Sequence, residues 1–417
     1  MEEKINPDKA ILAGLDAAVF SKEETATEST LEELKALLET AGGTAVGTLL
    51  QSRPAPDPHS FLGEGKVEEL RQAVEATGAN MVIFDNDLSP SQIRTLEDIT
   101  GATVIDRSAL ILDIFAQRAK TREGRLQVEL AQYQYLLPRL SGMGRSLSRQ
   151  GGGIGTRGPG ETRLESDRRH IRTRISRLQQ ELKEVRRVRG VQRQLREKNS
   201  VPVVALIGYT NAGKSTLLNA LTGAGIPANN RLFDTLDTTT RRMTVSDTLD
   251  VLLSDTVGFI AKLPHNLVEA FQATLEELQY ADLLLHVIDA SDPERTVHME
   301  VVEKLASQLA PQGVPIIEVY NKADLVEPQL IPVGENKVAI SAATGTGLPR
   351  LLELVEQNLD TGVRRVTMKL PYSAAGEVDR IHREGKVFTT EYENDGILVE
   401  AALSREMQGR YRDYILS

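Results

Sequence analysis

Short apolar runs and segments with helical spacing alternate along the first quarter of the chain. Each run has the length of a buried strand, and each helical segment ends in glycine, a common helix stop. The expected strands are 9–16, 44–51, 79–85 and 102–106. The expected helices are 30–43, 66–78 and 89–101. Strands that alternate with amphipathic helices predict a small parallel α/β layer.

A helical pattern follows and is interrupted by a polar loop. Residues 107 to about 140 have helical spacing, and residues 141–162 are rich in Gly, Ser and Arg without apolar periodicity. Beyond the loop, apolar residues recur at 4-3-4-3 spacing, which predicts one narrow stripe on a long helix. The stripe consists of Ile171, Ile175, Leu178, Leu182 and Val185. Two helices joined by a loop predict a helical hairpin arm.

A second α/β block and a small C-terminal region complete the chain. The block begins with the apolar run VPVVALI, and a short β-α-β-β-α pattern with the turn signal ENDG starts near residue 366. The sequence therefore predicts an α/β fold in four parts. These are an N-terminal α/β domain (1–120), a helical hairpin arm (121–200) containing the Gly/Arg-rich loop (141–162), a second α/β domain (201–362) and a small α+β C-terminal domain (363–417).

Composition excludes several classes of protein. The 417 residues contain no cysteine, so disulfides, thiolate zinc sites and cysteine nucleophiles are absent. The chain opens with MEEKINPDK, which lacks the apolar run of a signal peptide, and nowhere do 18 apolar residues occur in a row. We therefore expect no membrane span and a cytoplasmic location.

Charge is distributed unevenly along the chain. The net charge is −10, yet residues 163–199 hold thirteen Lys or Arg against five acids, a net +8 that leaves −18 for the remainder. Because the apolar stripe of this helix is narrow, most of its surface should be exposed and basic. The helix could contact a phosphate backbone, or it could be an ordinary solvated helix.

The chemistry of the second α/β block begins with GYTNAGKST, which has the pattern GxxxxGK[ST]. Its glycines let the backbone N–H groups turn toward phosphate oxygens, and the start of the following helix adds partial positive charge. Lys214 can reach the β- and γ-phosphates, and the Ser215 hydroxyl can bind Mg²⁺. A chance glycine turn is disfavoured because an apolar strand precedes the motif and a helix follows. The predicted phosphate-binding residues are Gly208, Tyr209, Thr210, Asn211, Ala212, Gly213, Lys214, Ser215 and Thr216.

A second motif, DTVG, follows another apolar run about 40 residues later. Asp255 would hold Mg²⁺ through a water, and the Gly258 amide would contact the γ-phosphate. Thr256 and Val257 complete this predicted part of the nucleotide site. Four residues alone are a weak match, but their place after the first motif and at a strand end favours the functional interpretation.

Two further loops predict recognition of guanine. In NKAD, Asp324 can accept two hydrogen bonds from the guanine N1–H and its exocyclic amine, and a buried Asp324 would be left unpaired beside adenine. Asn321 would brace the loop, and Lys322 would pack on the base. The loop SAATG, after the apolar run KVAI, would offer its backbone to the guanine oxygen. The residues concerned are Asn321, Lys322, Ala323, Asp324, Ser341, Ala342 and Ala343.

The order GYTNAGKS, LFDTLDTTTR, DTVGFI, NKAD and SAATG resembles the HflX family of translational GTPases. Residues 151–175 and 52–66 are similar to two further signatures of that family. The resemblance covers nearly the whole chain and is weakest after about residue 365. It implies a P-loop GTPase domain at 201–362, with GTP and GDP as ligands and Mg²⁺ as cofactor.

The resemblance also implies a first switch segment with Thr235 as a second Mg²⁺ ligand. The family often has Ala at position 234 and Pro at 238, where this chain has Asp and Thr, and Thr239 or Thr240 could also reach the ion. The implied switch residues are Phe233, Asp234, Thr235, Leu236 and Asp237. The implied catalytic residues are Lys214, Thr235 and Gly258, and the metal residues are Ser215, Thr235 and Asp255.

Three side chains near these motifs bear on the rate of hydrolysis. Phe259 follows DTVG, where a water-orienting glutamine could stand, so we expect slow intrinsic hydrolysis that a partner stimulates. Asn211 makes K⁺ a second candidate cofactor, as in potassium-activated GTPases, although an asparagine can also stabilise a turn. Arg241 and Arg242 could act as arginine fingers, but a solvated charge pair is the favoured interpretation.

The family resemblance implies the large ribosomal subunit as partner, with the arm reaching ribosomal RNA. Aromatic residues make up only 4% of the chain, which favours recognition of backbone and shape over base stacking. The candidate RNA-binding residues are Arg145, Arg149, Arg157, Arg163, Arg168, Arg169 and Arg172.

The implied role is splitting or rescue of stalled or idle ribosomes under stress by a monomer. A nucleotide-dependent RNA-remodelling factor and a switch acting on a protein partner remain alternatives. ATP binding by the N-terminal domain has no second phosphate-loop motif to support it, because GEGK (63–66) is too short and is better explained as a helix start.

Overall fold

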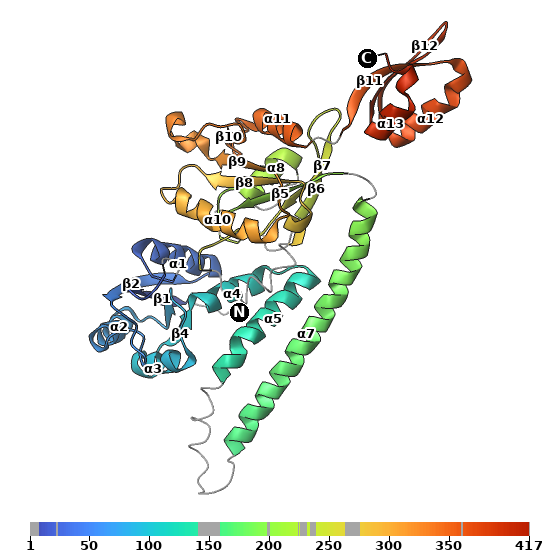
Figure 1. Cartoon of the computed structure of the whole chain (residues 1–417). Helices are drawn as coiled ribbons and strands as arrows, with labels where there is room; N and C mark the ends of the chain where they lie inside the picture. Colours follow the sequence, from blue (N-terminus) through green and yellow to red (C-terminus); the bar gives the residue numbers. More distant parts are fainter. Residues whose placement is uncertain are drawn as a thin grey trace, which may run out of the picture. The chain divides into compact units, whose positions relative to one another are not determined.

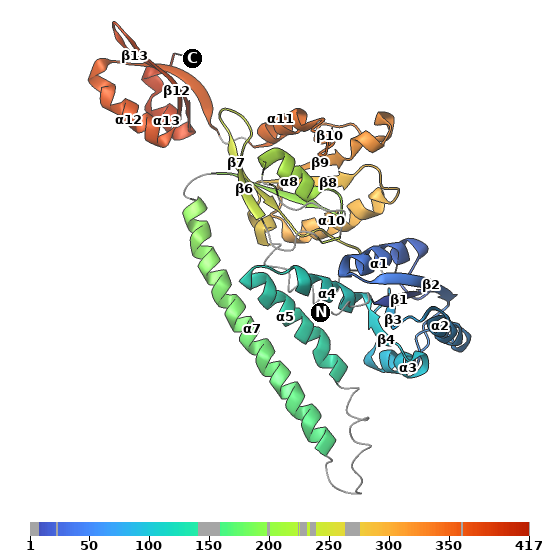
Figure 2. The same cartoon turned by 180° about the vertical axis from the view of Figure 1, so that it is seen from behind.

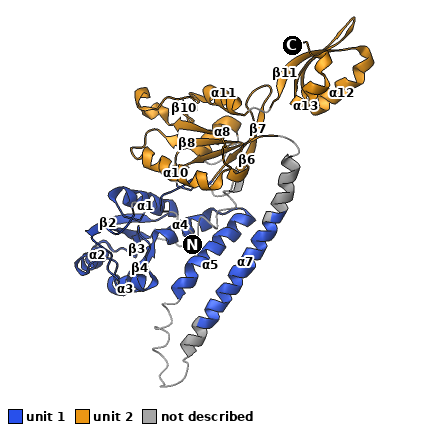
Figure 3. Cartoon of the chain, viewed as in Figure 1, with its two compact units in different colours: residues 1–194, 229–237, 257–275 blue, residues 195–228, 238–256, 276–417 orange. Residues whose placement is uncertain are grey.

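The computed structural model describes residues 8–21, 24–140, 159–197, 201–223, 225, 232–233, 239–262, 276–359 and 362–416. The chain forms two compact units (Figure 3). The first holds residues 1–194, 229–237 and 257–275, and the second holds 195–228, 238–256 and 276–417. Two short segments of the predicted GTPase domain therefore group with the N-terminal part, so contacts cluster differently from the four-part division, whose boundaries remain a prediction.

The first unit is built on a four-stranded parallel sheet in the order β2-β1-β3-β4 (Figure 1). Its strands are β1 (Lys9–Ala17), β2 (Thr44–Arg53), β3 (Met81–Phe84) and β4 (Thr103–Asp106). The helices between them are α1 (Glu28–Ala41), α2 (Glu64–Thr77) and α3 (Pro90–Thr100). Every strand and helix predicted for this region is confirmed, with ends that differ by a few residues.

Local sequence sets the ends of these helices. Thr27 and Ser89 form capping boxes at the starts of α1 and α3, and α1, α2 and α3 each end on a glycine with left-handed backbone. Gly63 of GEGK is the N-cap of α2, which supports the helix-start interpretation of that motif.

The described helices between β4 and β5 are α4 (Arg107–Arg118), α5 (Arg122–Arg139) and α7 (Pro159–Glu197). The single helical pattern predicted from 107 to about 140 was wrong in one respect, because the backbone is extended at Ala119 and the Thr121 side chain caps a new helix. The predicted loop 141–162 was also too long. Helix α7 begins at Pro159, a favoured residue at a first helical position since it lacks an N–H. Residues 141–158 lie outside the described residues.

The predicted apolar stripe pairs α7 with α5 (Figure 2). Leu178 and Leu182 of α7 are buried against Leu126 and Leu130 of α5. Ile175, Val185 and Tyr133 pack partly buried against this cluster. The stripe is thus covered within the chain, and the charged residues beside it stay accessible.

The second unit holds a six-stranded sheet in the order β10-β9-β8-β5-β7-β6, in which only β6 is antiparallel. Its strands are β5 (Val203–Gly208), β6 (Thr239–Thr244), β7 (Asp250–Asp255), β8 (Leu283–Asp289), β9 (Ile316–Asn321) and β10 (Lys337–Ala339). Its helices are α8 (Lys214–Thr222), α10 (Arg295–Leu309) and α11 (Leu348–Asn358), with short 3₁₀ turns η2 (Glu276–Tyr280), η3 (Ala323–Leu325) and η4 (Pro328–Leu330).

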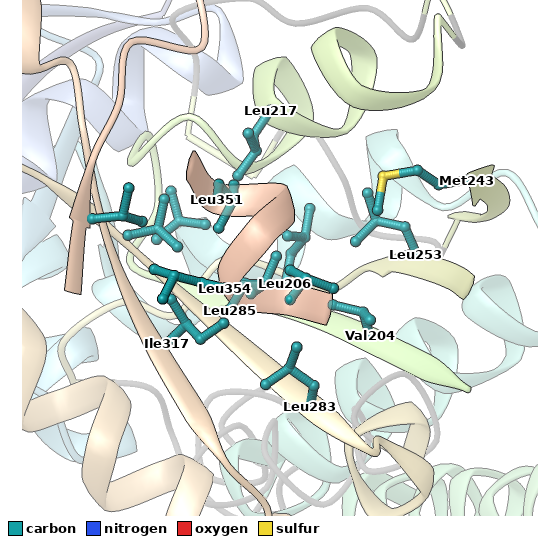
Figure 4. Close-up of a cluster of buried hydrophobic side chains, with 14 of the residues drawn as sticks. Val204, Leu206, Leu217, Met243, Leu253, Leu283, Leu285, Ile317, Leu351 and Leu354 are labelled. Atoms are coloured by element: carbon teal, nitrogen blue, oxygen red, sulfur yellow. The ribbon is translucent and has the colours of Figure 1, made fainter. Parts of the chain in front are cut away.

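One continuous apolar core fills the space between this sheet, α8 and α11 (Figure 4). Val204 and Leu206 of β5, Leu217 of α8 and Leu351 and Leu354 of α11 are among its members. Strands buried in this way have near-continuous apolar sequences, as VPVVALI does. The core fixes the strand ends from which the functional loops leave.

The C-terminal region confirms the predicted β-α-β-β-α pattern. It comprises β11 (Arg364–Leu370), η5 (Tyr372–Ala374), α12 (Ala375–Glu384), β12 (Lys386–Glu393), β13 (Gly396–Leu403), α13 (Arg405–Arg410) and η6 (Arg412–Tyr414). The sheet order is β11-β13-β12, all antiparallel, and β12 and β13 meet at the predicted ENDG turn. Across the described part of the chain, no helix has both the length and the apolar character needed to cross a membrane.

Candidate functional site

The functional motifs of the second unit follow the carboxyl ends of neighbouring parallel strands. Gly208 ends β5 and the loop 209–213 follows it, Asp255 ends β7, Asn321 ends β9, and Ser341 comes two residues after β10. Because parallel strands end at the same edge of a sheet, these loops form one side of the domain, where open α/β sheets bind ligands.

The loop after β5 requires glycine at two positions. Gly208 has φ 155°, and a Cβ there would lie 2.3 Å from the carbonyl oxygen of Val287. Gly213 has φ 93°, and a Cβ there would lie 2.2 Å from Nδ2 of Asn321. Asn211 also has a positive φ of 62°, which asparagine tolerates better than most residues. The two glycines therefore let the loop fit closely against β8 and the NKAD loop.

The first turn of α8 carries the cation and hydroxyl expected for phosphate and metal binding. Lys214 is buried, and its Nζ donates to the carbonyl oxygens of Gly208 (3.0 Å) and Tyr209 (2.8 Å). The Ser215 hydroxyl donates to Oδ2 of Asp255 at 2.9 Å. Thr256 is fully buried and donates to the carbonyl of Leu206. The two predicted motifs are thus joined directly.

Asn321 connects three loops through one buried amide. Its Nδ2 donates to the Ala212 carbonyl at 2.9 Å, and its Oδ1 accepts from the Ala342 N–H at 2.9 Å. The phosphate-type loop, NKAD and SAATG are therefore held together by a single side chain. Asn321 thus makes the hydrogen bonds that its predicted bracing role requires.

The residues expected at the base differ in their exposure. Lys322 has left-handed backbone and pairs with Asp289 of β8, with Nζ and Oδ2 2.6 Å apart. Ser341 and Ala342 are buried, whereas Ala343 is exposed. Asp324 lies in the turn η3 and is exposed, so the burial on which its discrimination against adenine depends would have to come from the bound base.

Sequence reasoning missed an aromatic contact beside the loop. The rings of Tyr209 and His298 of α10 are stacked, with centroids 3.7 Å apart and an interplanar angle of 11°. Nδ1 of His298 lies 3.0 Å from Oδ2 of Asp292, and this contact lowers the pKa of Asp292. No local motif marks His298. The sequence DASD after β8 could have drawn attention to Asp289 and Asp292, which pair with Lys322 and His298.

Several predicted residues belong to the first unit or lie outside the described residues. Val257, Gly258 and Phe233 belong to the first unit, and Asp234, Thr235, Leu236 and Asp237 lie outside the described residues. Phe259 is buried. Arg241 is exposed, and Arg242 is an exposed partner of Asp250 at 2.8 Å, which supports the solvated-charge interpretation of these arginines.

The donor set near α8 fits Mg²⁺. A hydroxyl oxygen and a carboxylate oxygen are the hard donors that this ion prefers, and Mg²⁺ usually adds waters and phosphate oxygens to one or two protein ligands. Ser215 and Asp255 supply such a pair. The described residues include no cluster of three or more His, Cys, Asp or Glu arranged to hold a metal, so a cage made by protein alone is not found there.

A parallel sheet whose ends carry GxxxxGKS, DTVG and NKAD defines a P-loop GTPase. Three family profiles match the chain in succession: "GTP-binding GTPase N-terminal" over residues 28–116, "GTP-binding GTPase Middle Region" over 118–196 and "50S ribosome-binding GTPase" over 203–322. Curated relatives then specify the family. The chain belongs to the HflX family of GTPases.

Two relatives illustrate this membership. GTPase HflX of Caldanaerobacter subterraneus subsp. tengcongensis is 49% identical over 411 residues, covering 98% of this chain and 94% of the relative. GTPase HflX of Escherichia coli K12 is 49% identical over 347 residues, covering 82% of each chain. A crystal structure of a GTP-binding protein from Sulfolobus solfataricus with GDP has a TM-score of 0.44 at 23% identity, covering 84% of this chain and 98% of that one.

Replacing Asn321 by alanine should loosen all three loops at once. The change leaves the Ala212 carbonyl and the Ala342 N–H without their partner, and each unsatisfied buried group costs about 1–3 kcal/mol. We expect GTP affinity to fall at least about tenfold and the thermal midpoint of unfolding to decrease. Fluorescent-nucleotide titration and calorimetry measure both. Asn358→Ala is the control, since Asn358 also donates two hydrogen bonds but in α11. Equal affinities for the two variants would contradict the bracing role.

The protonation of Lys214 predicts a pH dependence of nucleotide binding. Burial lowers the pKa of Lys214 to about 8, so the free protein loses this charge as pH rises through that value. Neighbouring phosphates favour the charged form, and binding above about pH 8 must therefore take up a proton. We expect GTP affinity to fall by up to about tenfold per pH unit above pH 8. Calorimetry in buffers of different ionisation enthalpy measures the uptake, and affinity that does not change across this range would exclude it.

Proposed function

We propose that this GTPase binds GTP and Mg²⁺ at the edge of the six-stranded sheet and docks on the large ribosomal subunit through its helical arm. Splitting or rescue of stalled or idle ribosomes is the role we assign to it. Family membership supports the proposal, as does the profile for residues 203–322, which is described as a 50S ribosome-binding GTPase. The observation that carries the choice of partner is the charge on α7.

Arginines near the start of the described part of α7 differ from those further along. Arg174 pairs with Glu129 of α5, Arg177 with Glu181 and Arg187 with Glu184. Within the described residues, Arg168, Arg169 and Arg172 form no ion pair. A long helix with unpaired arginines toward one end suits a phosphate backbone, because each contact would release condensed counterions. Arg145, Arg149 and Arg157 precede this helix and extend the proposed contact.

The nucleotide site would act through the residues already described. Lys214 would leave the Gly208 and Tyr209 carbonyls to contact the β- and γ-phosphates, and Ser215 with Asp255 would hold Mg²⁺. Asp324 would accept hydrogen bonds from guanine. Thr235 and Gly258 would be drawn to the γ-phosphate, which makes the switch an order–disorder event, and hydrolysis would favour release from the ribosome.

Phe259 supports slow hydrolysis by the isolated protein. Its ring is buried and has no group that can orient a water by hydrogen bonding. A partner that reshapes the site is therefore part of the proposal. The two alternative functions, RNA remodelling and a switch on a protein partner, lack an observation of comparable weight in the described residues.

Hydrolysis measured with and without isolated large ribosomal subunits tests the proposal. We expect strong stimulation of the wild type, none of Lys214→Ala, and a loss of stimulation when Arg168, Arg169 and Arg172 are all replaced by Gln. The triple variant should bind subunits more weakly, with the slope of log K against log [salt] reduced by about three.

The matched control replaces the exposed arginines Arg383, Arg405 and Arg412 of the C-terminal region by Gln. Equal losses in both triple variants would show a general charge effect and refute the arm. Absence of any stimulation would refute ribosome-triggered hydrolysis. Binding that survives neutralisation of the arm would favour the switch on a protein partner.

Potassium is the further cofactor that we propose, on the basis of Asn211. Its side chain is exposed at the loop, and its backbone is left-handed. Asn211→Gly keeps this backbone accessible and removes the amide oxygen. We expect wild-type hydrolysis to be faster in K⁺ than in Na⁺, and the variant to be indifferent. Equal rates of wild-type GTP hydrolysis in K⁺ and Na⁺ would exclude the potassium role and show that Asn211 only stabilises the turn.

A further inference from the structure

A buried cluster of charges lies at the carboxyl ends of β3 and β4 in the first unit. Asp85 follows β3 and is fully buried, and Arg107 begins α4. Nη1 of Arg107 donates to Oδ1 of Asp85 at 2.8 Å, and Nη2 pairs with Glu33 of α1. The hydroxyl of Thr30 donates to Oδ2 of Asp85 at 2.7 Å. This edge of a parallel α/β sheet is where such folds place ligands.

The fourth charge of the cluster comes from the segment that follows DTVG. Lys262 lies four residues after Gly258, its side chain is only 9% exposed, and its Nζ pairs with Oδ2 of Asp85. Arg107 also donates to the Ala261 carbonyl at 3.3 Å. Burial lowers the pKa of Lys262, so Asp85 is the group that favours its charge. Two carboxylates and two cations then balance in a poorly solvated place.

The other segment next to the nucleotide motifs is anchored on the same helices. The N–H of Leu232 donates to the Thr40 hydroxyl of α1 at 3.3 Å. The ring of Phe233 packs edge-on against Phe115 of α4, with centroids 4.6 Å apart. Phe233 and Lys262 both have φ 57°, a conformation that residues with a side chain rarely adopt. Such backbone persists when its surroundings hold it in place.

We propose that Lys262 is a positioning residue that couples the nucleotide to the N-terminal α/β domain through Asp85 and Arg107. The proposal goes beyond ribosome docking and rests only on the proposed nucleotide site. By the proposed nucleotide site, Gly258 would contact the γ-phosphate in the GTP state and lose this contact in the GDP state, and only three residues (259–261) separate Gly258 from Lys262. If Lys262 moves away, the buried carboxylate of Asp85 loses one of its charged partners, which is energetically costly. A nucleotide state that displaces Lys262 therefore lowers the stability of the β3–α4 region. By linkage, the cluster alters the preference between GTP and GDP to the same degree.

Hydrogen exchange of the full-length protein tests this coupling. Amides of residues 81–87 and 107–118 are followed with saturating GDP and with saturating non-hydrolysable GTP analogue. We expect exchange rates to differ about tenfold between the two nucleotides in the wild type, within the usual range of allosteric coupling. The difference should fall below about twofold in Lys262→Met and persist in Lys262→Arg, which keeps the charge. Lys66→Met is the matched control, because Lys66 pairs with Glu69 on α2, with the charged atoms 2.9 Å apart.

An equilibrium measurement provides the reciprocal readout. The ratio of the dissociation constants for GDP and the analogue should shift in Lys262→Met. The shift should equal the factor by which this variant reduces the nucleotide-dependent difference in exchange rate, and Lys66→Met should show no shift. A purely structural role would change both affinities alike and leave the ratio unchanged.

Three results would overturn the proposal. The first is identical hydrogen-exchange rates of the wild type with GDP and with the GTP analogue. This result needs no variant, so it holds even if Lys262→Met fails to fold. The second is retention of the full difference in a folded Lys262→Met. Failure of both nucleotides to bind would overturn this proposal together with the nucleotide site, whereas binding without coupling removes only this one.

Discussion

The two hydrogen bonds of the Asn321 side-chain amide set the geometry of the loops at the carboxyl edge of the six-stranded sheet. A parallel sheet brings its loops to one edge but does not fix their mutual distances, because each loop leaves a different strand. One side chain that donates to Ala212 and accepts from Ala342 sets two of those distances. The close fit of Gly213 against the same amide explains why that position excludes a side chain. Backbone shape and hydrogen bonding are thus two aspects of one contact.

Charge is used in opposite ways in the two halves of unit 1. In the α/β layer, Asp85, Arg107, Glu33 and Lys262 satisfy one another in a buried cluster. Buried pairs of this kind contribute little net stability but make separation costly, which suits a specific connection between segments. On the described part of α7, Arg169, Arg172 and Arg177 are exposed, and an exposed ion pair contributes about 0–1 kcal/mol. Those arginines therefore have little structural value in the free chain and are available to a partner.

Much of the fold could be predicted because its signals are local. Glycine stops and apolar runs predicted the strands of the first sheet and the helices between them, and the stripe on α7 identified the face that packs against α5. The break at Ala119 was missed because Thr121 is an ordinary polar residue until its capping contact is seen. Motif spacing located Lys214, Ser215 and Asp255, which the fold brings together.

Other features depend on contacts distant in sequence and leave no local pattern. The Tyr209–His298 stack joins residues 89 positions apart, and the Lys262–Asp85 pair joins residues 177 positions apart. The motif NKAD indicated which groups Asp324 could bind, but it did not indicate that the side chain is exposed in the free chain. Residue type states what a side chain can do, and the fold decides which neighbours it meets.

The length of α7 changes what the net charge of the chain means. A helix of 39 residues with a rise of 1.5 Å per residue is about 58 Å long, and Arg169 lies about 42 Å from the C-terminal end of the same helix. At physiological ionic strength the Debye length is about 8 Å, so the electrostatic interaction between charges at the two ends of the helix is almost completely screened. A counterion or phosphate near Arg169 responds to the local potential, not to the total of −10. The isoelectric point of the whole chain therefore does not predict the sign of the charge on a partner that binds near Arg169.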